Sequence, residues 1–215
     1  MATAPEKLAA LRHLLAARFP AVPRTASRVL PTGIPALDDA IGGLPLGAVT
    51  EIVCTAPSCG SHLFLGQLLA AAGATPTRVA LVDGTDSFDP SSFAGDLLAR
   101  LVWVRCHTTA EALQAVDLLA RDANLGLLVL DLRRAPEIDL RRTPATQWYR
   151  LQRAVEPTDL ALVVATPRAS IPSAQVRLVL SLSHSVDALS HDRPALANQL
   201  APALQRQRLQ IASAG

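Results

Sequence analysis

Short apolar runs alternate along the chain with segments in which apolar residues recur at helical spacing. The runs are nearly continuous in valine, leucine and alanine, which is typical of parallel strands covered by helices on both faces. Between them, helices are predicted at 62–73, 109–123 and 145–156. The pattern therefore predicts an α/β fold with a mainly parallel sheet flanked by helices. The predicted strands are VTEIVC (49–54), RVALVD (78–83), LGLLVLDL (125–132), LALVVATP (160–167) and, at the edge of the sheet, VRLVLSLS (176–183).

The N-terminal part of the chain lies outside this alternating pattern. Leu8, Leu11 and Leu15 recur at helical spacing within 6–18, and a proline-containing linker follows. Residues 1–28 are therefore predicted to form a helical arm and a linker. Two roles stay open for the arm: docking on a partner, or packing on the chain's own core.

The rest of the chain is predicted to form one core domain, 29–190, and a short C-terminal tail, 191–215. A short helix is expected at 35–41, ended by a pair of glycines. The tail is helix-prone but interrupted by Pro202, and its segment RQRLQI (206–211) is an alternative short edge strand. The sequence shows no internal repeat and no second domain.

The composition of the chain bears on its location and on the classes of protein to which it can belong. Half of the residues are hydrophobic and 18% are charged, yet no run of about 18 apolar residues occurs, so no membrane span is expected. The N-terminus lacks a long apolar segment with a cleavage site, and the three cysteines show neither a CxxC pair nor metal-ligand spacing. We therefore expect a reduced, cytoplasmic chain without a metal site, with its cysteines as small buried hydrophobes. A net charge of +2 and 3% aromatic residues do not by themselves argue for a nucleic-acid surface.

The stretch TAPSCGSH (55–62) joins a predicted strand to a predicted helix, which is where a phosphate-binding loop would lie. In the pattern GxxxxGK[ST], the glycines bring backbone N–H groups onto phosphates, the Lys reaches the outer phosphates and the Ser/Thr holds Mg²⁺. Here Thr55 stands at the first glycine and Gly60 keeps the second, while Ser61 replaces the Lys and His62 replaces the Mg²⁺ ligand. An ordinary histidine is mostly neutral at pH 7, so the loop lacks its fixed cation. Ser61 and His62 then either cap the helix or help to bind some anion.

The sequence around this loop resembles the start of the RecA core. The resemblance rests on TGIPALDDAIGGLPLGAVTEI followed by the loop and an apolar helix, and it continues in RVALVDGTDSFDP, in TAEALQAVDLLARDANLGLLVLDL and in LALVVATP. It covers roughly residues 29 to 183 of the chain. The resemblance implies a RecA-like fold, which the alternating pattern predicts independently.

The resemblance also implies that the residues of ATP hydrolysis are missing together. RecA-type ATPases carry a catalytic Glu two residues after the Asp that ends the second strand, and Thr85 occupies that position. The Walker B carboxylate matches Asp131, whose alternative role is to cap the turn after its strand. The nucleotide-sensing Gln is replaced by Thr166 and Pro167, and the long DNA-binding loop shrinks to PRASIPS (167–173). Because phosphoryl transfer depends on positioning and charge neutralisation, we expect no enzyme activity and no cofactor, with ATP and Mg²⁺ disfavoured.

Among relatives of RecA, the short chain with lost ATPase residues most resembles the ImuA family. That resemblance implies a non-catalytic adaptor in damage-induced mutagenesis and translesion synthesis. The implied partners are an ImuB-like relative of the Y-family polymerases and an error-prone replicative-type polymerase, with RecA and single-stranded DNA as further candidates. Two alternatives stay open: a weak nucleotide-binding protein or ATPase of the RecA-like repair class, and a SulA-like inhibitor of cell division.

A basic segment, LRRAPEIDLRRTPATQWYRLQR (132–153), lies where the resemblance places the first DNA-binding loop of RecA. Arginine clusters suit phosphates and aromatic side chains stack on bases, so contact with DNA or a partner is one interpretation. Glu137 and Asp139 interrupt the run, and Trp148 and Tyr149 also suit a core, so a solvated, salt-bridged face is the other. The candidate contacts are Arg133, Arg134, Arg141, Arg142, Arg150 and Arg153.

Overall fold

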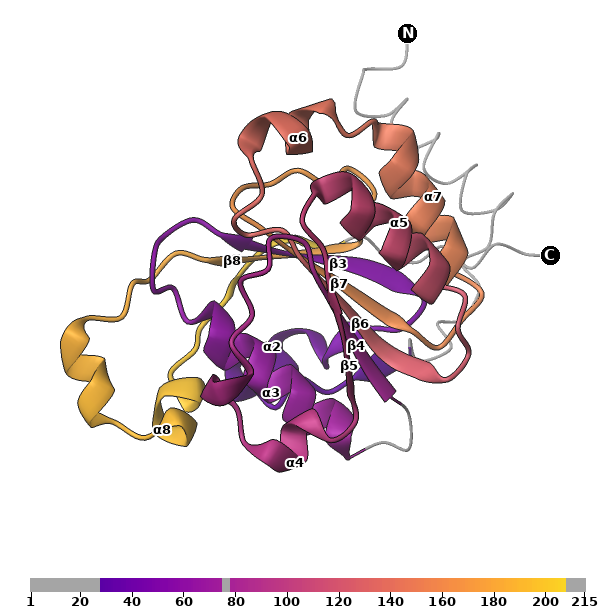
Figure 1. The fold of residues 1–215 in the computed structure, drawn as a ribbon. Helices are drawn as coiled ribbons and strands as arrows, with labels where there is room; N and C mark the ends of the chain where they lie inside the picture. Colours follow the sequence, from indigo (N-terminus) through magenta and orange to yellow (C-terminus); the bar gives the residue numbers. More distant parts are fainter. Residues whose placement is uncertain (1–27, 75–77, 208–215) are drawn as a thin grey trace, which may run out of the picture. The chain divides into compact units, whose positions relative to one another are not determined.

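A seven-stranded sheet runs through the part of the chain that the computed structural model describes, residues 28–74 and 78–207 (Figure 1). The strand order is β5-β4-β6-β7-β3-β8-β9, and each neighbouring pair is parallel except β8 and β9. The predicted arm with Leu8, Leu11 and Leu15 lies outside the described residues. The strands are β3 (Ala48–Cys54), β4 (Arg78–Asp83), β5 (Leu101–Arg105), β6 (Leu125–Asp131), β7 (Ala161–Thr166), β8 (Val176–Leu180) and β9 (Ala203–Gln207).

The predicted α/β fold with a mainly parallel sheet is confirmed, and all five predicted strands are present. The prediction that VRLVLSLS forms the edge of the sheet is wrong, because the chain turns back and β9 pairs with β8 in antiparallel orientation. Residues that were expected to form a tail from 191 onward therefore supply the edge strand. The opposite edge is β5, LVWVR, which the sequence pattern missed because this edge strand is short and its residues are only half-buried or exposed.

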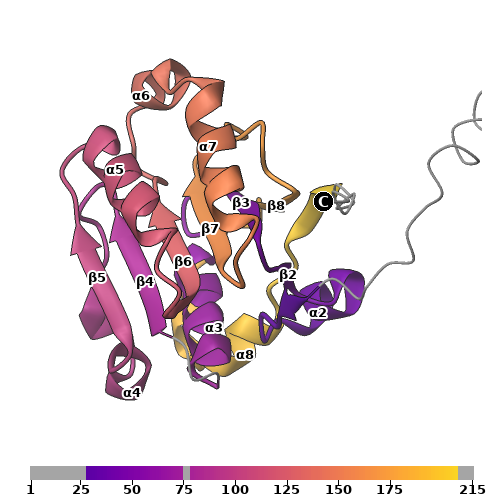
Figure 2. The same cartoon turned by 90° about the vertical axis from the view of Figure 1, so that its right-hand side faces the viewer.

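Helices cover the sheet on both faces, and each face has its own hydrophobic cluster (Figure 2). Side chains alternate along β6 between the two clusters: Leu127 and Val129 join one, and Leu128 and Leu130 join the other. This alternation explains why the strands are continuous apolar runs. One layer contains α2 (Pro35–Ile41), α3 (Ser61–Gly73), α4 (Gly95–Leu98) and α8 (Arg193–Asn198); the other contains α5 (Thr109–Leu119), α6 (Glu137–Arg142) and α7 (Ala145–Val155).

A small antiparallel ladder, β1 (Val29–Leu30) with β2 (Leu44–Pro45), brackets the TGIPALDD stretch ahead of β3. The carboxylate of Asp38 accepts hydrogen bonds from the backbone N–H groups of Thr32 and Gly33, at 2.9 and 3.0 Å, and so closes the turn into α2. The predicted helix at 35–41 is confirmed, and it ends at Gly42 with φ of 78°.

The strand β3 carries one charged side chain, Glu51, which is fully buried. Its Oε1 accepts hydrogen bonds from the Thr166 hydroxyl at 3.0 Å and from the backbone N–H groups of Ser170 and Ile171 at 2.6 and 3.2 Å. Its Oε2 accepts from Arg177 Nε at 2.6 Å. Glu51 therefore fastens the short β7–β8 loop to the middle of the sheet.

Two general features of the described residues bear on function. No helix among them has the length and the apolar character that crossing a bilayer requires. Within the same residues, no group of three or more histidine, cysteine or acidic side chains is arranged to hold a metal ion. The three cysteines are free thiols.

Candidate functional site

A cavity of about 540 Å³ opens beside the loop between β3 and α3. The loop residues 54–59 form one wall, and Ser61, His62, Arg133 and Arg134 form another. The carboxyl ends of β3, β6 and β7 meet here, which is where an open parallel sheet binds its ligands. The cavity is therefore the candidate functional site, at the position where a phosphate-binding loop would lie.

The last position of the loop has a backbone conformation that favours glycine. Gly60 has φ of 80°, and a Cβ built there would lie 2.6 Å from a methyl carbon of Leu200 and 3.1 Å from the His184 ring. Gly60 is also the N-cap of α3, which has no side-chain capping hydrogen bond. The prediction that Ser61 and His62 cap this helix is therefore wrong, because both residues already lie inside its first turn.

The segment that follows β8 lies alongside the loop. The Thr55 N–H donates to the Leu180 carbonyl at 3.1 Å, and the His184 N–H donates to the Ser58 carbonyl at 3.0 Å. These bonds, with the contact of Leu200 near Gly60, engage one side of the loop with the chain's own C-terminal segment. The conformation of the loop therefore depends on residues more than a hundred positions later.

The guanidinium of Arg133 fills the space between α3 and the end of β6. Its Nε donates to the two carboxylate oxygens of Asp131 at 2.9 and 3.1 Å, and its Nη2 donates to the same carboxylate. Its Nη1 donates to Ser61 Oγ, and its Nη2 lies 3.1 Å from His62 Nε2. The Arg133 side chain is only 15% exposed, and that of Asp131 only 3%. Arg133 thus points into the site and contacts both residues that replace the Lys and Ser/Thr of a phosphate-binding loop.

This arrangement changes the role that Asp131 can play. Asp131 caps the turn after its strand, as one interpretation predicted, because its Oδ1 accepts the Arg133 backbone N–H at 3.0 Å. Both of its oxygens also bind the Arg133 guanidinium. A Walker B carboxylate has to be available to a Mg²⁺ ion and its water shell, whereas this one is neutralised by an internal cation. Mg²⁺ would have to break a buried, bidentate ion pair to reach it.

His62 does not supply the missing positive charge of the loop. Burial lowers the pKa of His62 below its ordinary value, and the positive charge of Arg133 lowers it further. The imidazole is therefore neutral at pH 7, in keeping with its position against a guanidinium. Arg133 and Arg134 are the two permanently charged residues among those that line the cavity.

The acidic residues at and just after the end of β4 bind other groups and do not line the cavity. Asp83 is buried and accepts the backbone N–H groups of Ser87 and Phe88 at 2.9 and 2.8 Å. The Thr85 hydroxyl donates to the Ser87 hydroxyl at 3.3 Å. Asp86 forms a two-point ion pair with Arg105, with both distances 2.7 Å. The described residues lining the cavity include no carboxylate, so none of them is placed as a general base for an attacking water.

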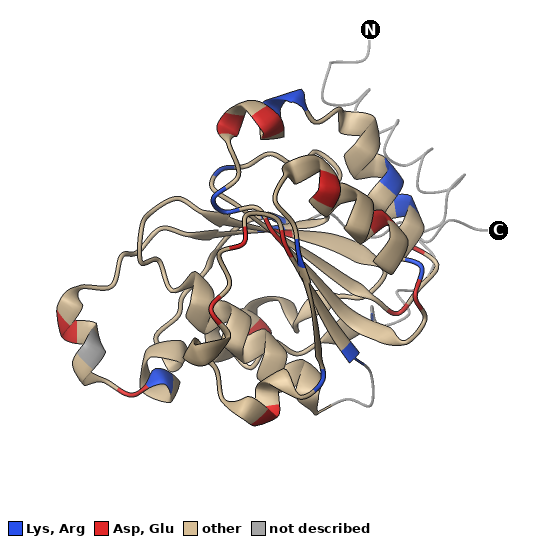
Figure 3. Cartoon of the chain, viewed as in Figure 1, with Lys and Arg blue, Asp and Glu red and all other residues tan. Residues whose placement is uncertain are grey.

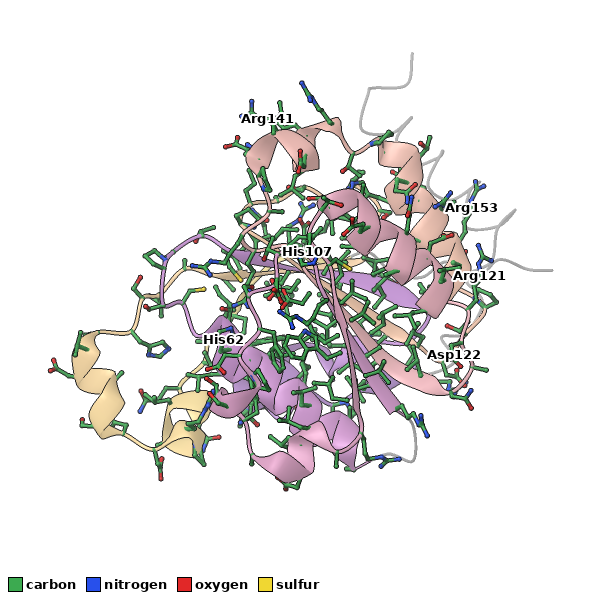
Figure 4. The ribbon with its side chains drawn as sticks, viewed as in Figure 1. His62, His107, Arg121, Asp122, Arg141 and Arg153 are labelled. Carbon is green, nitrogen blue, oxygen red and sulfur yellow. The ribbon has the colours of Figure 1, made fainter. Side chains whose placement is uncertain are left out.

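The six arginines of the basic segment are spread over the turn after β6, α6 and α7. Figure 3 shows acidic residues beside basic ones on α6, and Figure 4 labels Arg141 on α6 and Arg153 on α7. Arg141, on α6, pairs with Glu137, and Arg150, on α7, pairs with Asp117 of α5 at 3.1 Å. Trp148 is buried in the core and so presents no face to a base. Three further members of the segment are exposed: Arg134, Arg142 and Arg153.

Sequence reasoning missed three features of this region: the buried hydrogen-bond network of Glu51, the inward position of Arg133, and the proximity of Cys54 to Cys59. One of them leaves a signal in the sequence. A single charge inside the apolar run VTEIVC predicts a buried polar network.

Comparison with known proteins finds partial similarity to RecA. The chain is 34% identical to RecA of Streptomyces avermitilis over 113 residues, which are 51% of this chain and 30% of that protein. It is 34% identical to RecA of Thermus aquaticus over 119 residues, 53% of this chain and 34% of that protein. RecA of Streptomyces ambofaciens is 36% identical over 107 residues, 48% and 28% of the two chains. No family model matches the sequence.

The similarity supports membership of the RecA-like superfamily. The chain spans about a third of the length of the curated relatives it matches. The sheet described above, parallel except for β9 and flanked by helices, is consistent with a RecA-like core.

Proposed function

We propose that the chain is a non-catalytic adaptor with a RecA-like core that acts in DNA repair, in the manner of the ImuA family in translesion synthesis. The partial similarity to RecA proteins supports the link to repair. The observation that carries the non-catalytic part is the contact of Arg133 with Asp131, Ser61 and His62. Arg133 contacts the residues that stand at the Lys and Mg²⁺-ligand positions of the loop, and it pairs with the carboxylate at the Walker B position.

The loss of ATP chemistry is then a consequence of internal charge pairing. The loop has no Lys, its histidine is neutral, and the carboxylate that would direct Mg²⁺ is bound to Arg133. Hydrolysis also needs a group that orients water, and the cavity lining of the described residues offers no carboxylate for it. The loop keeps the place of a phosphate-binding loop between a strand and a helix, without its Lys and its Ser/Thr ligand.

Thermal unfolding with millimolar Mg-ATP tests the absence of nucleotide binding. A ligand at about 100 times its dissociation constant stabilises the folded state by roughly 2.7 kcal/mol. That is a rise in Tm of roughly 5–10 °C for a chain of this size, and we expect no such rise and no phosphate release. A rise that Gly60→Leu abolishes, with the fold retained by circular dichroism, would overturn the proposal.

A nucleotide-binding protein without hydrolysis is the second candidate, and the open cavity of about 540 Å³ beside Arg134 favours it. It predicts a rise in Tm with Mg-ATP in the wild type that Arg134→Ala reduces. Hydrolysis by the wild type but not by a His62→Ala, Asp131→Ala double variant would instead indicate an ATPase.

Co-purification tests the adaptor role directly. A tagged full-length chain, recovered from its own host after DNA damage, is expected to bring down a Y-family polymerase relative and a replicative-type polymerase. Recovery of neither polymerase, in cells where both are detected, would contradict the adaptor role. Inhibition of the tubulin-like division protein by the purified chain would support the SulA-like alternative instead.

A further inference from the structure

Two of the three cysteines lie at the two ends of the loop that borders the cavity. Cys54 ends β3, Cys59 precedes the N-cap of α3, and both line the cavity. Cys54 is half-buried and Cys59 is buried, and the two thiols lie close enough to shift each other's pKa. The segment between them is just the four loop residues 55–58, so a change in the path of this short loop could bring the two sulfurs together.

The two thiols have different surroundings, so they differ in acidity. Interaction with Cys54 lowers the pKa of Cys59 to about 6; burial opposes this, and hydrogen bonds from Ser61 and the charge of Arg133 assist it. Interaction with Cys59 raises the pKa of Cys54, and burial raises it further. Cys59 is therefore the more acidic thiol of a pair that titrates together. The other titratable or charged groups facing the pair are Asp131, His62 and Arg134.

We propose that Cys54 and Cys59 form a thiol–disulfide exchange site whose substrates are small anionic disulfides that enter the cavity. Cys59 is the attacking sulfur because it is held as a thiolate, and Cys54 is the resolving sulfur because it keeps its proton until a disulfide is present. Because Arg133 is paired with Asp131, the exposed Arg134 is the cation in the cavity lining that favours an anionic substrate over a cationic one.

The reaction is balanced in two exchange steps. The Cys59 thiolate attacks one sulfur of the small disulfide, forms a mixed disulfide and releases one thiolate, which takes a proton from water. Cys54 then loses its proton to solvent, and its sulfur attacks Cys59 Sγ. The second half of the substrate leaves as a thiolate. The two cysteines are oxidised to one disulfide, and the small disulfide is reduced to two thiols.

The first experiment treats the reduced full-length chain with oxidised glutathione and maps the products by mass spectrometry. The wild type is expected to lose two hydrogens and to show a Cys54–Cys59 cross-link. Cys54→Ser is expected to stop at a glutathione adduct on Cys59, while Cys59→Ser forms no adduct at Cys54 under the same conditions. Cys106→Ser is the matched control, because Cys106 lies outside the cavity lining, and it should behave as the wild type. Adducts on Cys106 as fast as on Cys59, or no cross-link in a folded wild type, would overturn the proposal.

The second experiment separates an activated thiol from a merely adjacent one. The rate of iodoacetamide alkylation at Cys59 is expected to rise with pH about a midpoint near 6 and then to level off. A midpoint near the ordinary cysteine value of about 8.5 would contradict the proposal. Oxidised glutathione is expected to react several-fold faster than cystamine, its cationic counterpart, and Arg134→Ala should narrow that ratio. An unchanged ratio would remove the proposed preference for anions.

Discussion

Two buried arginine–carboxylate pairs, Glu51–Arg177 and Asp131–Arg133, are similar in burial but differ in what surrounds them. In each pair an arginine side chain is 15% exposed, and its carboxylate is 0% exposed for Glu51 and 3% for Asp131. Glu51 receives donors from Arg177, from a hydroxyl and from two backbone N–H groups of the β7–β8 loop. Among the described residues, the Asp131 carboxylate accepts hydrogen bonds from Arg133 alone, from its guanidinium and from its backbone N–H. Arg133 also lines an open cavity.

The difference shows how burial alone fails to distinguish a structural charge from one at a site. The Glu51 pair is enclosed, and its hydrogen bonds hold together segments that lie far apart in the sequence. The Asp131 pair is local, spanning two residues, and its remaining contacts go to the residues that replaced a Lys and a Mg²⁺ ligand. The Glu51 pair joins distant segments of the fold, whereas the Asp131 pair stays within one turn beside the candidate site.

The largest effect is expected from removing the enclosed carboxylate. Glu51→Ala leaves the Arg177 guanidinium buried without a counter-ion and three other donors without their acceptor. We expect unfolding free energy to fall by about 3–5 kcal/mol, and Tm to fall by roughly 6–20 °C for a chain of this size. Urea denaturation measures the change, with Glu156→Ala as the matched exposed control. If Glu51→Ala lowers the unfolding free energy no more than Glu156→Ala does, the Glu51 pair does not stabilise the fold.

A smaller loss of unfolding free energy is expected at the Asp131–Arg133 pair, which borders the cavity. Arg133→Met removes the guanidinium but leaves Asp131 beside a cavity that water enters, so we expect a loss of about 1–3 kcal/mol. The double variant Asp131→Asn, Arg133→Met is expected to recover part of that loss, because no buried charge is then unpaired. The same urea series measures both variants. If Arg133→Met costs as much as Glu51→Ala, the two pairs do not differ in kind.

The smallest change in stability is expected on the surface of α6, where Arg141 pairs with the exposed Glu137. Replacing Arg141 and Arg142 with Ala is expected to change unfolding free energy by no more than about 0.5 kcal/mol.

The same variant tests contact with DNA. If the segment binds single strands, the slope of log affinity against log salt should fall by up to about one unit per lost phosphate contact. Equal slopes, or no binding at low salt, would assign these arginines to a protein partner or to solvent.

The interior strands of the sheet could be predicted because they are continuous apolar runs too short for a buried helix. VTEIVC, RVALVD and LGLLVLDL are runs of this kind, and none of the three lies at an edge of the sheet. The edges were harder to predict. LVWVR and ALQRQ are five-residue strands with exposed positions; the first was missed, and the alternative edge strand RQRLQI overlaps the second only at 206–207.

The residues that the site lacks could be predicted from the sequence, but the contacts that Arg133 makes there could not. The absence of Lys, Glu and Gln can be read along the chain, one position at a time. That Arg133 turns inward depends on the width of the space that Ser61 and His62 leave, which is a property of packing. The proximity of Cys54 and Cys59 depends likewise on the path of the loop between them, for which composition carries no signal.

The position of β3 in the sheet has a consequence for the nascent protein on the ribosome. This strand lies among the first of the described elements in the chain, yet its two neighbours are β7 and β8. More than a hundred further residues must be translated before either neighbour exists. At roughly 5–20 residues per second, the apolar strand and the helix that follows it wait roughly 5–25 s without their partners. Glu51 then acts as a solubilising charge within an exposed apolar segment until Arg177 is made, and its burial marks the end of that wait.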